Sequence, residues 1–558
     1  MKKIFLITLL TNLIYCQDLQ LTLESVTRDI PTANFGGQTW RGPSWQNSAF
    51  VDSVATMYPD LLAFPPSPDL WNWETGWFYN QQFLDTCCVD SIELNWGQVN
   101  ADVLEITPVN FQNALDQLEA EGLYCLNMIS SSFYKQLTDI NYGINNGVLF
   151  ERIRLGDEME KAGNELSISH FPTAQDYAFA CDNYIDTLRT LLPNTKIAVS
   201  AGNYGSWNPR AQYWNEALYN MSNPADAFRW SAFFYLKDSD TIFTTKQLLA
   251  YPFDQIPTNE VVRGFSDTIT ELQDYELWVG YNITDNTFDK RYLNRWSLVL
   301  MLSASHNLFL ENHLVKDISL FNVGGIFDNW DALDTENNFS KRATGIFASI
   351  WNKAKLDKNQ ATPISIPFEF TDTANYYNNN GTMRSVNYHK IFGWRFENNI
   401  DYSGSVILTN ISEDTLEISV DGILSGNVTW EKWSSDSLYA FIDSLDYINV
   451  TSDNGTDNIT ILPFSINVAR SNCINDTDND GICDEVDNCP EDYNPGQEDI
   501  DNNNLGDVCD EIANTPNYSN TKKLVTVIDI LGRQTFQKEL QLLIYNDGTI
   551  EKKYLLDK

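Results

Sequence analysis

Two sets of carboxylates in this chain of 558 residues could do chemistry. One is Glu158, which follows a strand-like run at 151–155 after Gly156 and has Asp157 beside it. Burial at the end of a strand raises the pKa of a carboxyl group, which can then donate a proton to a leaving oxygen. The other set lies at 471–511, where 14 Asp and Glu stand without a single Lys or Arg. The first set indicates acid/base catalysis and the second a cation site.

The acidic segment repeats a cation-binding pattern. In the first copy Asp476, Asp478 and Asp480 alternate and Gly481 follows at the bend, and a second copy spans 494–510. Ca²⁺ takes about six to eight oxygen ligands, and alternate side chains on a wrapped loop can converge on one ion. The candidate ligands are Asp476, Asp478, Asp480, Asp484, Asp487, Asp499, Asp501, Asn503, Asp507 and Asp510.

Both copies closely resemble thrombospondin type 3 repeats. The resemblance implies calcium as cofactor, a disulfide between Cys489 and Cys509 that joins the copies, and a second pair formed by Cys473 and Cys483. Asn503 stands where the repeat usually has Asp, so we expect the second site to bind calcium more weakly.

The composition is that of a folded acidic protein. The chain has 36 Lys+Arg against 76 Asp+Glu, a net charge of −40, which argues against a nucleic-acid partner because phosphate binding needs clustered cations. With 43% hydrophobic residues it can bury a large core. The segment 471–512 is too poor in apolar residues to order itself, so calcium and disulfides must supply its fold as a stiff spacer. A disordered acidic linker is the alternative.

The N-terminus has the pattern of an export signal. Lys2 and Lys3 precede an apolar run at 4–15 that is too short to span a bilayer, as in a signal peptide over 1–16. We expect cleavage after Cys16. A lipid anchor on Cys16 is less favoured because bulky Tyr15 precedes it. The other eight of the nine cysteines fit an oxidising compartment, and no other apolar run predicts a transmembrane segment.

The C-terminal segment 513–558 is predicted to be a linker and a small β module. KKLVTVIDILGR (522–533) and LIYNDGTIEKKYLL (543–556) alternate apolar and polar residues around Gly turns. They closely resemble the C-terminal sorting domain of the bacterial type IX secretion system. The resemblance implies that machinery as a partner and a secreted or outer-membrane surface location in a Gram-negative bacterium. An ordinary β appendage is the alternative.

The elements that must position Glu158 alternate between strand and helix over 17–355. This alternation predicts a parallel sheet, and its length suits a (β/α)8 TIM barrel, whose chemistry lies at the carboxyl ends of the strands. The predicted strands are 122–129, 151–155, 196–200, 227–234, 276–279 and 317–323, and the predicted helices are 111–121, 174–192 and 292–310.

Several predicted strand ends resemble those of a glycosidase group. The segments are GGQTWRGPSW (36–45), WNWETGWF (71–78), IRLGDE (153–158), FPTAQDY (171–177) and KIAV (196–199). They are similar to secreted retaining glycoside hydrolases of clan A, the arabinofuranosidase-like group. The resemblance implies a polysaccharide or oligosaccharide partner, hydrolysis of O-glycosyl bonds, and the acid/base role for Glu158, where the family carries Gly-Asn-Glu. Glu165 is the rival, because it has that tripeptide but no strand before it.

The second carboxylate of such an enzyme is missing from its expected place. A retaining glycosidase needs a nucleophile about 5–5.5 Å from the acid/base. The family's strand reads Trp-x-Thr-Glu-Tyr-Asn, whereas this chain has LWVGYN at 277–282, so that Gly280 stands where the family has Glu. No covalent glycosyl intermediate can then form by the usual route. Asp285, from the following loop, is a weak candidate nucleophile.

Three further departures change the same predicted pocket. The family's Arg-Tyr-Pro-Gly-Gly is Ala63-Phe-Pro-Pro-Ser67 here, and Phe233 replaces the His of a Thr-x-His-x-Tyr strand. Asp157 replaces the Asn before Glu158 and should disturb its pKa. Together these changes predict impaired catalysis.

Sugar binding remains possible without catalysis, because aromatic rings stack on sugars. The candidate substrate-binding residues are Trp40, Trp71, Trp73, Trp77, Tyr235, Tyr281 and Asn282. The four His residues form no metal-binding motif, so the sequence does not predict a zinc enzyme.

Residues 356–470 are predicted to form a β-sandwich, which packs beside the barrel in this family. The strand-like runs are 362–370, 386–392, 404–410, 416–420, 427–433 and 459–468. The pairing of Cys87, Cys88, Cys125 and Cys181 stays open.

Two functions follow from these patterns. In the first, the protein is a secreted glycoside-hydrolase-like protein that binds polysaccharide with impaired catalysis. In the second, it is an active glycosidase with Glu158 as acid/base and a relocated carboxylate.

Overall fold

The computed structural model places two compact units, residues 1–475 and 476–558. The structure describes residues 17–35, 43–65, 71–72, 77–78, 107–129, 131–161, 165–202, 210, 213–237, 243–258, 274–286, 290–324, 331–377, 383–400, 402–420, 422–424, 428–442, 447–454, 458–471, 476–478, 480, 482–484, 487–494, 496–500, 503–510, 524–528, 540–545 and 549–554.

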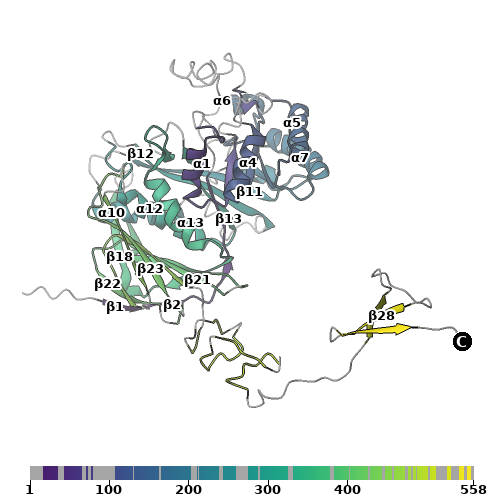
Figure 1. Ribbon diagram of the computed structural model, residues 1–558. Helices are drawn as coiled ribbons and strands as arrows, with labels where there is room; N and C mark the ends of the chain where they lie inside the picture. The colour runs from purple at the N-terminus through teal and green to yellow at the C-terminus, as the bar shows by residue number, and fades with distance from the viewer. Residues whose placement is uncertain are drawn as a thin grey trace, which may run out of the picture. The chain divides into compact units, whose positions relative to one another are not determined.

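Eight parallel strands close into a barrel in the first unit, which confirms the predicted architecture (Figure 1). The strands in chain order are β4 (Thr32–Phe35), β5 (Leu61–Phe64), β8 (Glu121–Leu126), β9 (Arg152–Leu155), β10 (Lys196–Ser200), β11 (Ala227–Lys237), β12 (Glu276–Asn286) and β13 (Val315–Leu320). The helices that follow them are α1 (Ser48–Ala55), α4 (Pro108–Leu118), α5 (Phe133–Asn145), α7 (Ala174–Leu191), α9 (Trp214–Tyr219), α10 (Thr245–Thr258), α12 (Trp296–Glu311) and α13 (Ala343–Lys355).

Short elements fill the loops of the barrel. These are β6 (Trp71–Asn72) and β7 (Trp77–Phe78), which pair as a hairpin, α6 (Glu165–His170), and the sheet of β14 (Asn322–Gly324), β15 (Asp331–Asp334) and β16 (Ser340–Lys341).

Strands β11 and β12 are longer than the sequence predicts. They pair in register from Ala227 and Glu276 to Lys237 and Asn286. The sequence predicts that the second strand ends at Val279, before Gly280 and Asn282, which are residue types common in turns. The continuous pairing with β11 overrides that local preference.

Helix α7 shows how local sequence fixes an element near the barrel mouth. Thr173 accepts a hydrogen bond from the Asp176 backbone N–H (3.2 Å), and the Asp176 carboxylate accepts one from the Thr173 N–H (2.9 Å). This capping box satisfies two backbone donors at the helix start. Its buried face has helical spacing and consists of Ala174, Tyr177, Ala178, Cys181, Ile185 and Leu188.

The predicted β-sandwich is also present, and its sheets are antiparallel except where β1 pairs with β22 in parallel. One sheet contains β2 (Thr22–Leu23), β17 (Gln360–Ser365), β20 (Ile391–Glu397), β21 (Gly404–Asn410), β26 (Ser465–Ser471), β23 (Thr429–Ser435) and β24 (Ile448–Asn454), with β3 (Arg28–Asp29) paired to β17. A second contains β1 (Gln17–Gln20), β22 (Leu416–Ser419) and β25 (Asn458–Ile461).

The sandwich begins earlier in the chain than predicted, because the predicted domain boundary assigns residues 17–355 to the barrel and only 356–470 to the sandwich. Strand β1 pairs with β22, and both β2 and β3 pair with β17. Residues 17–29 therefore add strands to the sandwich and not to the barrel. These strands are two to four residues long, so their sequence carries too little periodicity to reveal their partners.

Two strand-like runs of the sequence are each divided in the structure. The run 386–392 spans the end of β19 (Met383–His389) and the start of β20, and Lys390 lies between them. The run 459–468 spans β25 and β26, and between them Phe464 adopts φ of 54°, a conformation that ends a strand.

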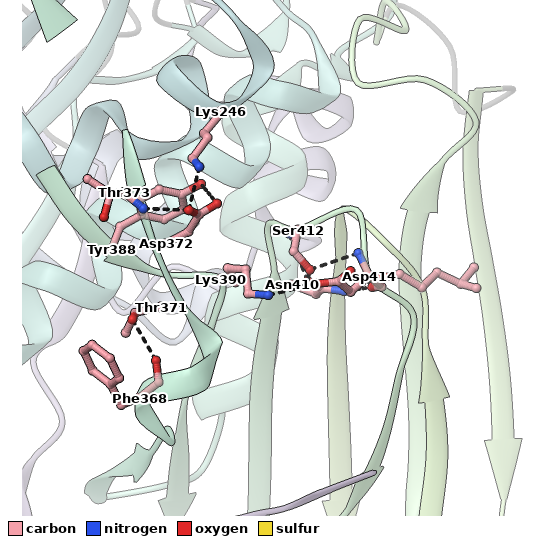
Figure 2. Close-up of polar contacts among 11 residues, drawn as sticks. Lys246, Phe368, Thr371, Asp372, Thr373, Tyr388, Lys390, Asn410, Ser412 and Asp414 are labelled. Atoms are coloured by element: carbon pink, nitrogen blue, oxygen red, sulfur yellow. Dashed lines mark hydrogen bonds and ion pairs between the residues drawn. The ribbon is translucent and has the colours of Figure 1, made fainter. Parts of the chain in front are cut away.

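A hairpin of β18 (Thr371–Tyr377) and β19 connects the sandwich region to the barrel helices (Figure 2). Lys246 of α10 forms an ion pair with Asp372 of β18 (2.5 Å), and the Tyr388 hydroxyl of β19 donates to the same carboxylate (3.5 Å). Lys390, between β19 and β20, forms an ion pair with Asp414 (2.9 Å), which lies between β21 and β22 (Figure 2).

Helices α12 and α13 lie between the barrel strands and the sandwich (Figure 1). Buried hydrogen bonds cross this interface. Trp394 Nε1 of β20 donates to Asn307 Oδ1 of α12 (3.0 Å), and Trp296 Nε1 donates to the Phe464 carbonyl (2.7 Å). The barrel and the sandwich therefore share one core, which continues from the helices into the sandwich sheet.

The second unit contains the acidic repeats and a sheet of three antiparallel strands. These are β27 (Leu524–Ile528), β28 (Leu540–Tyr545) and β29 (Ile550–Tyr554). Cys489 and Cys509 form the expected disulfide. Cys483 is also disulfide-bonded, and its expected partner Cys473 lies outside the described residues. Among the helices that the structure describes, none is long and apolar enough to cross a bilayer.

The interface bond between Trp394 and Asn307 gives a first prediction. In Trp394→Phe the buried Asn307 oxygen loses its donor, so we expect the free energy of unfolding to fall by about 1–3 kcal/mol in chemical denaturation. Trp433→Phe is the control, because Trp433 Nε1 bonds only within its own strand, to Glu431 (2.7 Å). Equal losses in the two variants would contradict a special role for the interface bond.

Candidate active site

Glu158 lies in a tight turn at the carboxyl end of β9, the fourth barrel strand. Gly156 and Glu158 both have positive φ, 72° and 53°. A Cβ on Gly156 would lie 2.8 Å from Met159 Cγ, so only glycine fits there. The Met159 N–H donates to Ser200 Oγ at the end of β10 (3.1 Å). The turn is therefore held against the neighbouring strand, and it keeps Glu158 at the barrel mouth.

The electrostatics of Glu158 combine burial with a close cation. Lys161 Nζ forms an ion pair with Glu158 Oε1, and 26% of the Glu158 side chain is exposed. Burial raises the pKa of Glu158, and Asp157 raises it further, as the sequence predicts. Lys161 and, more weakly, Arg229 lower this pKa. Asp157 itself pairs with Arg154 (3.2 Å).

Glu160 is a buried carboxyl that sequence reasoning missed. It is 7% exposed, and its Oε2 accepts a hydrogen bond from Ser200 Oγ (2.8 Å). Burial, followed by the charge of Glu158, raises the pKa of Glu160 to about 7. The mouth of the barrel therefore holds two carboxyl groups with raised pKa, both on the turn after β9.

The position expected for the nucleophile is filled by a cation. A Cβ built on Gly280 would lie 1.8 Å from Arg229 Nη2 and 2.5 Å from Arg229 Cζ. The guanidinium donates to Ser319 Oγ (3.1 Å) and to the Trp230 carbonyl, and Arg229 is 6% exposed. A side chain at residue 280 would therefore require a buried, hydrogen-bonded guanidinium to move.

Below this level the barrel interior is lined by further charges and then by apolar side chains. Arg152 pairs with Glu121 (2.9 Å) and Asp317 (3.6 Å), and its guanidinium lies 5.3 Å from the centre of the Trp278 ring. The apolar cluster at this level consists of Leu61, Ala63, Leu123, Ala198, Ala227 and Trp278. The interior is a packed, ion-paired core below the mouth.

An aromatic rim stands beside the Glu158–Lys161 pair. Lys161 Nζ lies 5.1 Å from the centre of the Phe233 ring, which packs 4.9 Å from Phe321 and 6.4 Å from Tyr235. Tyr235, a predicted substrate-binding residue, is 41% exposed. The structure thus brings Glu158 and the Phe233–Tyr235 edge together through Lys161, a residue that the sequence reasoning did not select.

Two other predicted binding residues are buried. Tyr281 faces away from the barrel interior. Its ring packs 4.9 Å from Phe309 of α12 and its hydroxyl donates to the Leu302 carbonyl (3.4 Å). Neighbouring residues of a strand face opposite sides, so Tyr281 cannot share the face of Gly280, and its assignment as a sugar contact is wrong. Asn282 is fully buried and its Oδ1 accepts the Ile283 N–H (2.7 Å).

The remaining predicted residues of the mouth either belong to elements described as backbone or lie outside the described residues. Trp40 and Trp73 lie outside the described residues. Trp71 and Trp77 are described only as backbone of the β6–β7 hairpin, and Asp285 only as backbone of β12, paired with Leu236. The rival Glu165 begins helix α6.

The first acidic repeat gathers carboxylates as the alternating pattern predicts. Ligand atoms of Asp476, Asp478 and Asp480 lie within 4.8 Å of one another. Asp478 Oδ2 and Asp487 Oδ2 are buried without a hydrogen-bond donor among the described residues. Partial burial and then the charges of Asp480, Asp487 and Asp476 raise the pKa of Asp478. Oxygens that lack donors, gathered among like charges, fit a hard cation.

The other predicted ligands bond mainly within their own loops. The Asp484 carboxylate accepts from the Thr477 N–H and hydroxyl (both 2.7 Å). In the second copy Asp507 accepts from the Ile500 N–H (2.9 Å). Asp499 accepts from the Asn503 N–H (3.2 Å), and Asn503 Nδ2 donates to Asp510 (3.0 Å). Asp501 lies outside the described residues.

Comparisons with known proteins place the fold. No protein-family model and no curated protein matches the sequence. Among solved structures, an α-L-arabinofuranosidase of Thermotoga maritima matches with a TM-score of 0.57 at 15% identity, over 80% of this chain and 97% of that one. A family 51 α-L-arabinofuranosidase of Bifidobacterium longum matches with a TM-score of 0.60 at 13% identity, over 81% and 99%.

A third match is a 4-O-α-L-rhamnosyl-β-D-glucuronidase of Fusarium oxysporum, with a TM-score of 0.51 at 10% identity, over 81% and 100% of the two chains. At sequence identities of 10–15%, the similarity between this chain and these structures concerns the fold alone. The chain has the TIM barrel and β-sandwich of family 51 arabinofuranosidases and related glycoside hydrolases.

The raised pKa of Glu160 predicts a pH-dependent stability. The unfolded chain releases this proton near the ordinary value of 4.5, below the folded value of about 7. Protonated Glu160 therefore contributes its full stabilisation of the fold below about pH 4.5. The free energy of unfolding then falls by about 3 kcal/mol as the pH rises to about 7. Urea unfolding at several pH values should show this loss in the wild type and not in Glu160→Gln. The exposed Glu369→Gln is the control, and identical profiles for wild type and Glu160→Gln would refute the assignment.

Proposed function

We propose that the protein is an exported, glycoside-hydrolase-like polysaccharide-binding protein whose barrel does not hydrolyse the bound glycan. The glycosidase-like fold implies a carbohydrate ligand. The mouth keeps a carboxyl group of raised pKa in Glu158 and an aromatic edge at Phe233 and Tyr235. These are features of a sugar-binding cleft.

One observation carries the proposal: the Arg229 guanidinium occupies the space that a side chain at residue 280 would fill. A retaining mechanism needs an anion that attacks the anomeric carbon, whereas this position presents a buried cation. Lys161 points the same way, because its ammonium group favours the charged form of Glu158 and so opposes the protonated form that a proton donor needs.

The second candidate function is an active glycosidase with a relocated carboxylate. Glu160 favours it, because its pKa of about 7 suits a general acid or base. Its burial and its hydrogen bond with Ser200 argue against direct contact with substrate. Asp285 is the other candidate for that role.

We also propose that the acidic repeats bind calcium and act as a spacer before a type IX sorting domain, for display at the outer-membrane surface or release. The unpaired oxygens of Asp478 and Asp487 support the cation. The three-stranded sheet of β27–β29 is compatible with a small sorting module.

The absence of turnover is tested directly. Wild type and Glu158→Gln should both bind a glycan from a panel of plant and algal polysaccharides, and neither should release reducing sugar or cleave aryl glycosides. Affinity electrophoresis measures binding and a reducing-end assay measures turnover. Turnover by the wild type that Glu158→Gln abolishes would establish the glycosidase instead.

Calcium binding is tested by calorimetry on the full chain. At about 100 times Kd, calcium should stabilise the second unit by about 2.7 kcal/mol and raise its unfolding temperature. Asp478→Asn should weaken binding, while Asp492→Asn, an exposed acid outside the cluster, should not. No heat and no thermal shift with the wild type would exclude the site.

A further inference from the structure

A groove of 810 Å³ lies on the outside of the barrel, between α7 and α9. Its floor contains Ala174, Ala178 and Ala217. Because alanine has no side chain beyond Cβ, the two helices leave a channel between their larger side chains. The volume falls within the range of about 300–1,000 Å³ that small-molecule sites occupy.

Two exposed aromatic rings line this groove, one from each side. Phe179 of α7 is 72% exposed, and Tyr213, directly before α9, is 56% exposed. Their burial would be favourable, and the fold leaves both largely in solvent. A pair of exposed rings in one concave site therefore indicates a ligand with an apolar face.

The other lining residues of the groove are hydrogen-bonding groups. Gln175 and Glu216 are exposed and make no side-chain hydrogen bond with the described part of the chain, and Asp182 and Asn220 lie further along the same helix faces. Rings interspersed with amides and carboxylates match a sugar, which offers C–H faces for stacking and hydroxyls that donate to carboxylates. An apolar protein partner would leave these polar groups unpaired.

The groove is connected to the candidate active site through Arg210, which lines it. Arg210 Nη2 donates to the Met159 carbonyl (2.7 Å), in the turn between Glu158 and Glu160, and Nε donates to the Phe171 carbonyl (2.9 Å). Both α7 and α9 follow barrel strands, so their first turns lie at the same end of the barrel as Glu158. A polysaccharide chain bound at the barrel mouth can therefore continue over the rim into the groove.

We propose that this α7–α9 groove is a second saccharide-binding site, which holds a more distant part of the polysaccharide chain that occupies the barrel mouth. The inference rests on the proposed glycan-binding function and specifies a polymer as its ligand. Neither an oligosaccharide of two or three sugars nor a monosaccharide would span both sites.

The test compares polymers with short fragments. Arabinan, arabinoxylan, pectin and laminarin, each with its trisaccharide, are titrated calorimetrically against wild type, Phe179→Ala, Tyr213→Ala and the double variant. Each single change should lower polymer affinity about 2- to 10-fold and leave trisaccharide affinity unchanged. Tyr134→Ala, an 83% exposed ring on α5 outside the groove, should change neither.

The outcomes separate the two proposals. Polymer binding that is unchanged in the double variant, or equal wild-type affinity for polymer and trisaccharide, overturns the groove and leaves glycan binding in the mouth intact. Binding of no glycan overturns the proposed function and the groove with it. A double variant that alters the oligomeric state by light scattering, with unchanged polymer affinity, would assign the groove to contacts between copies of the chain.

Discussion

The arrangement of the barrel mouth depends on a guanidinium that occupies the space above a glycine. Burying a cation is costly unless it is hydrogen-bonded, and Arg229 is held by Ser319 and the Trp230 carbonyl. The packing is possible only because residue 280 has no side chain. Glycine and arginine are thus a matched pair, and a side chain at residue 280 would require the Arg229 guanidinium to leave its position.

Most of the fold could be predicted from the sequence because its signals are local. Alternating apolar runs and amphipathic helices place β9, β10, α7 and α12 to within a few residues. The predictions that failed concern strands whose position depends on tertiary contacts. Strand β12 continues through Gly280 and Asn282 because β11 pairs with it, and the short strands at 17–29 are defined only by partners more than 300 residues away.

The site could be predicted only in part, for similar reasons. Glu158 stands at a strand end, which is a local signal, and its partner Lys161 lies three residues on. The burial of Glu160 depends on contact with Ser200, and the position of Arg229 depends on packing between strands, so neither has a local signature. Strand alternation places Tyr281 on the face opposite Gly280, where its ring packs against Phe309 of α12.

The pairing of residues 17–29 with the sandwich has a consequence for how the chain folds. Contacts between positions separated by more than 300 residues carry a large loop-closure entropy and form late. The barrel strands all lie inside that loop, so they can assemble before residues 17–29 pair with the sandwich sheets. During synthesis from the N-terminus, those first strands leave the ribosome well before the sheet that receives them.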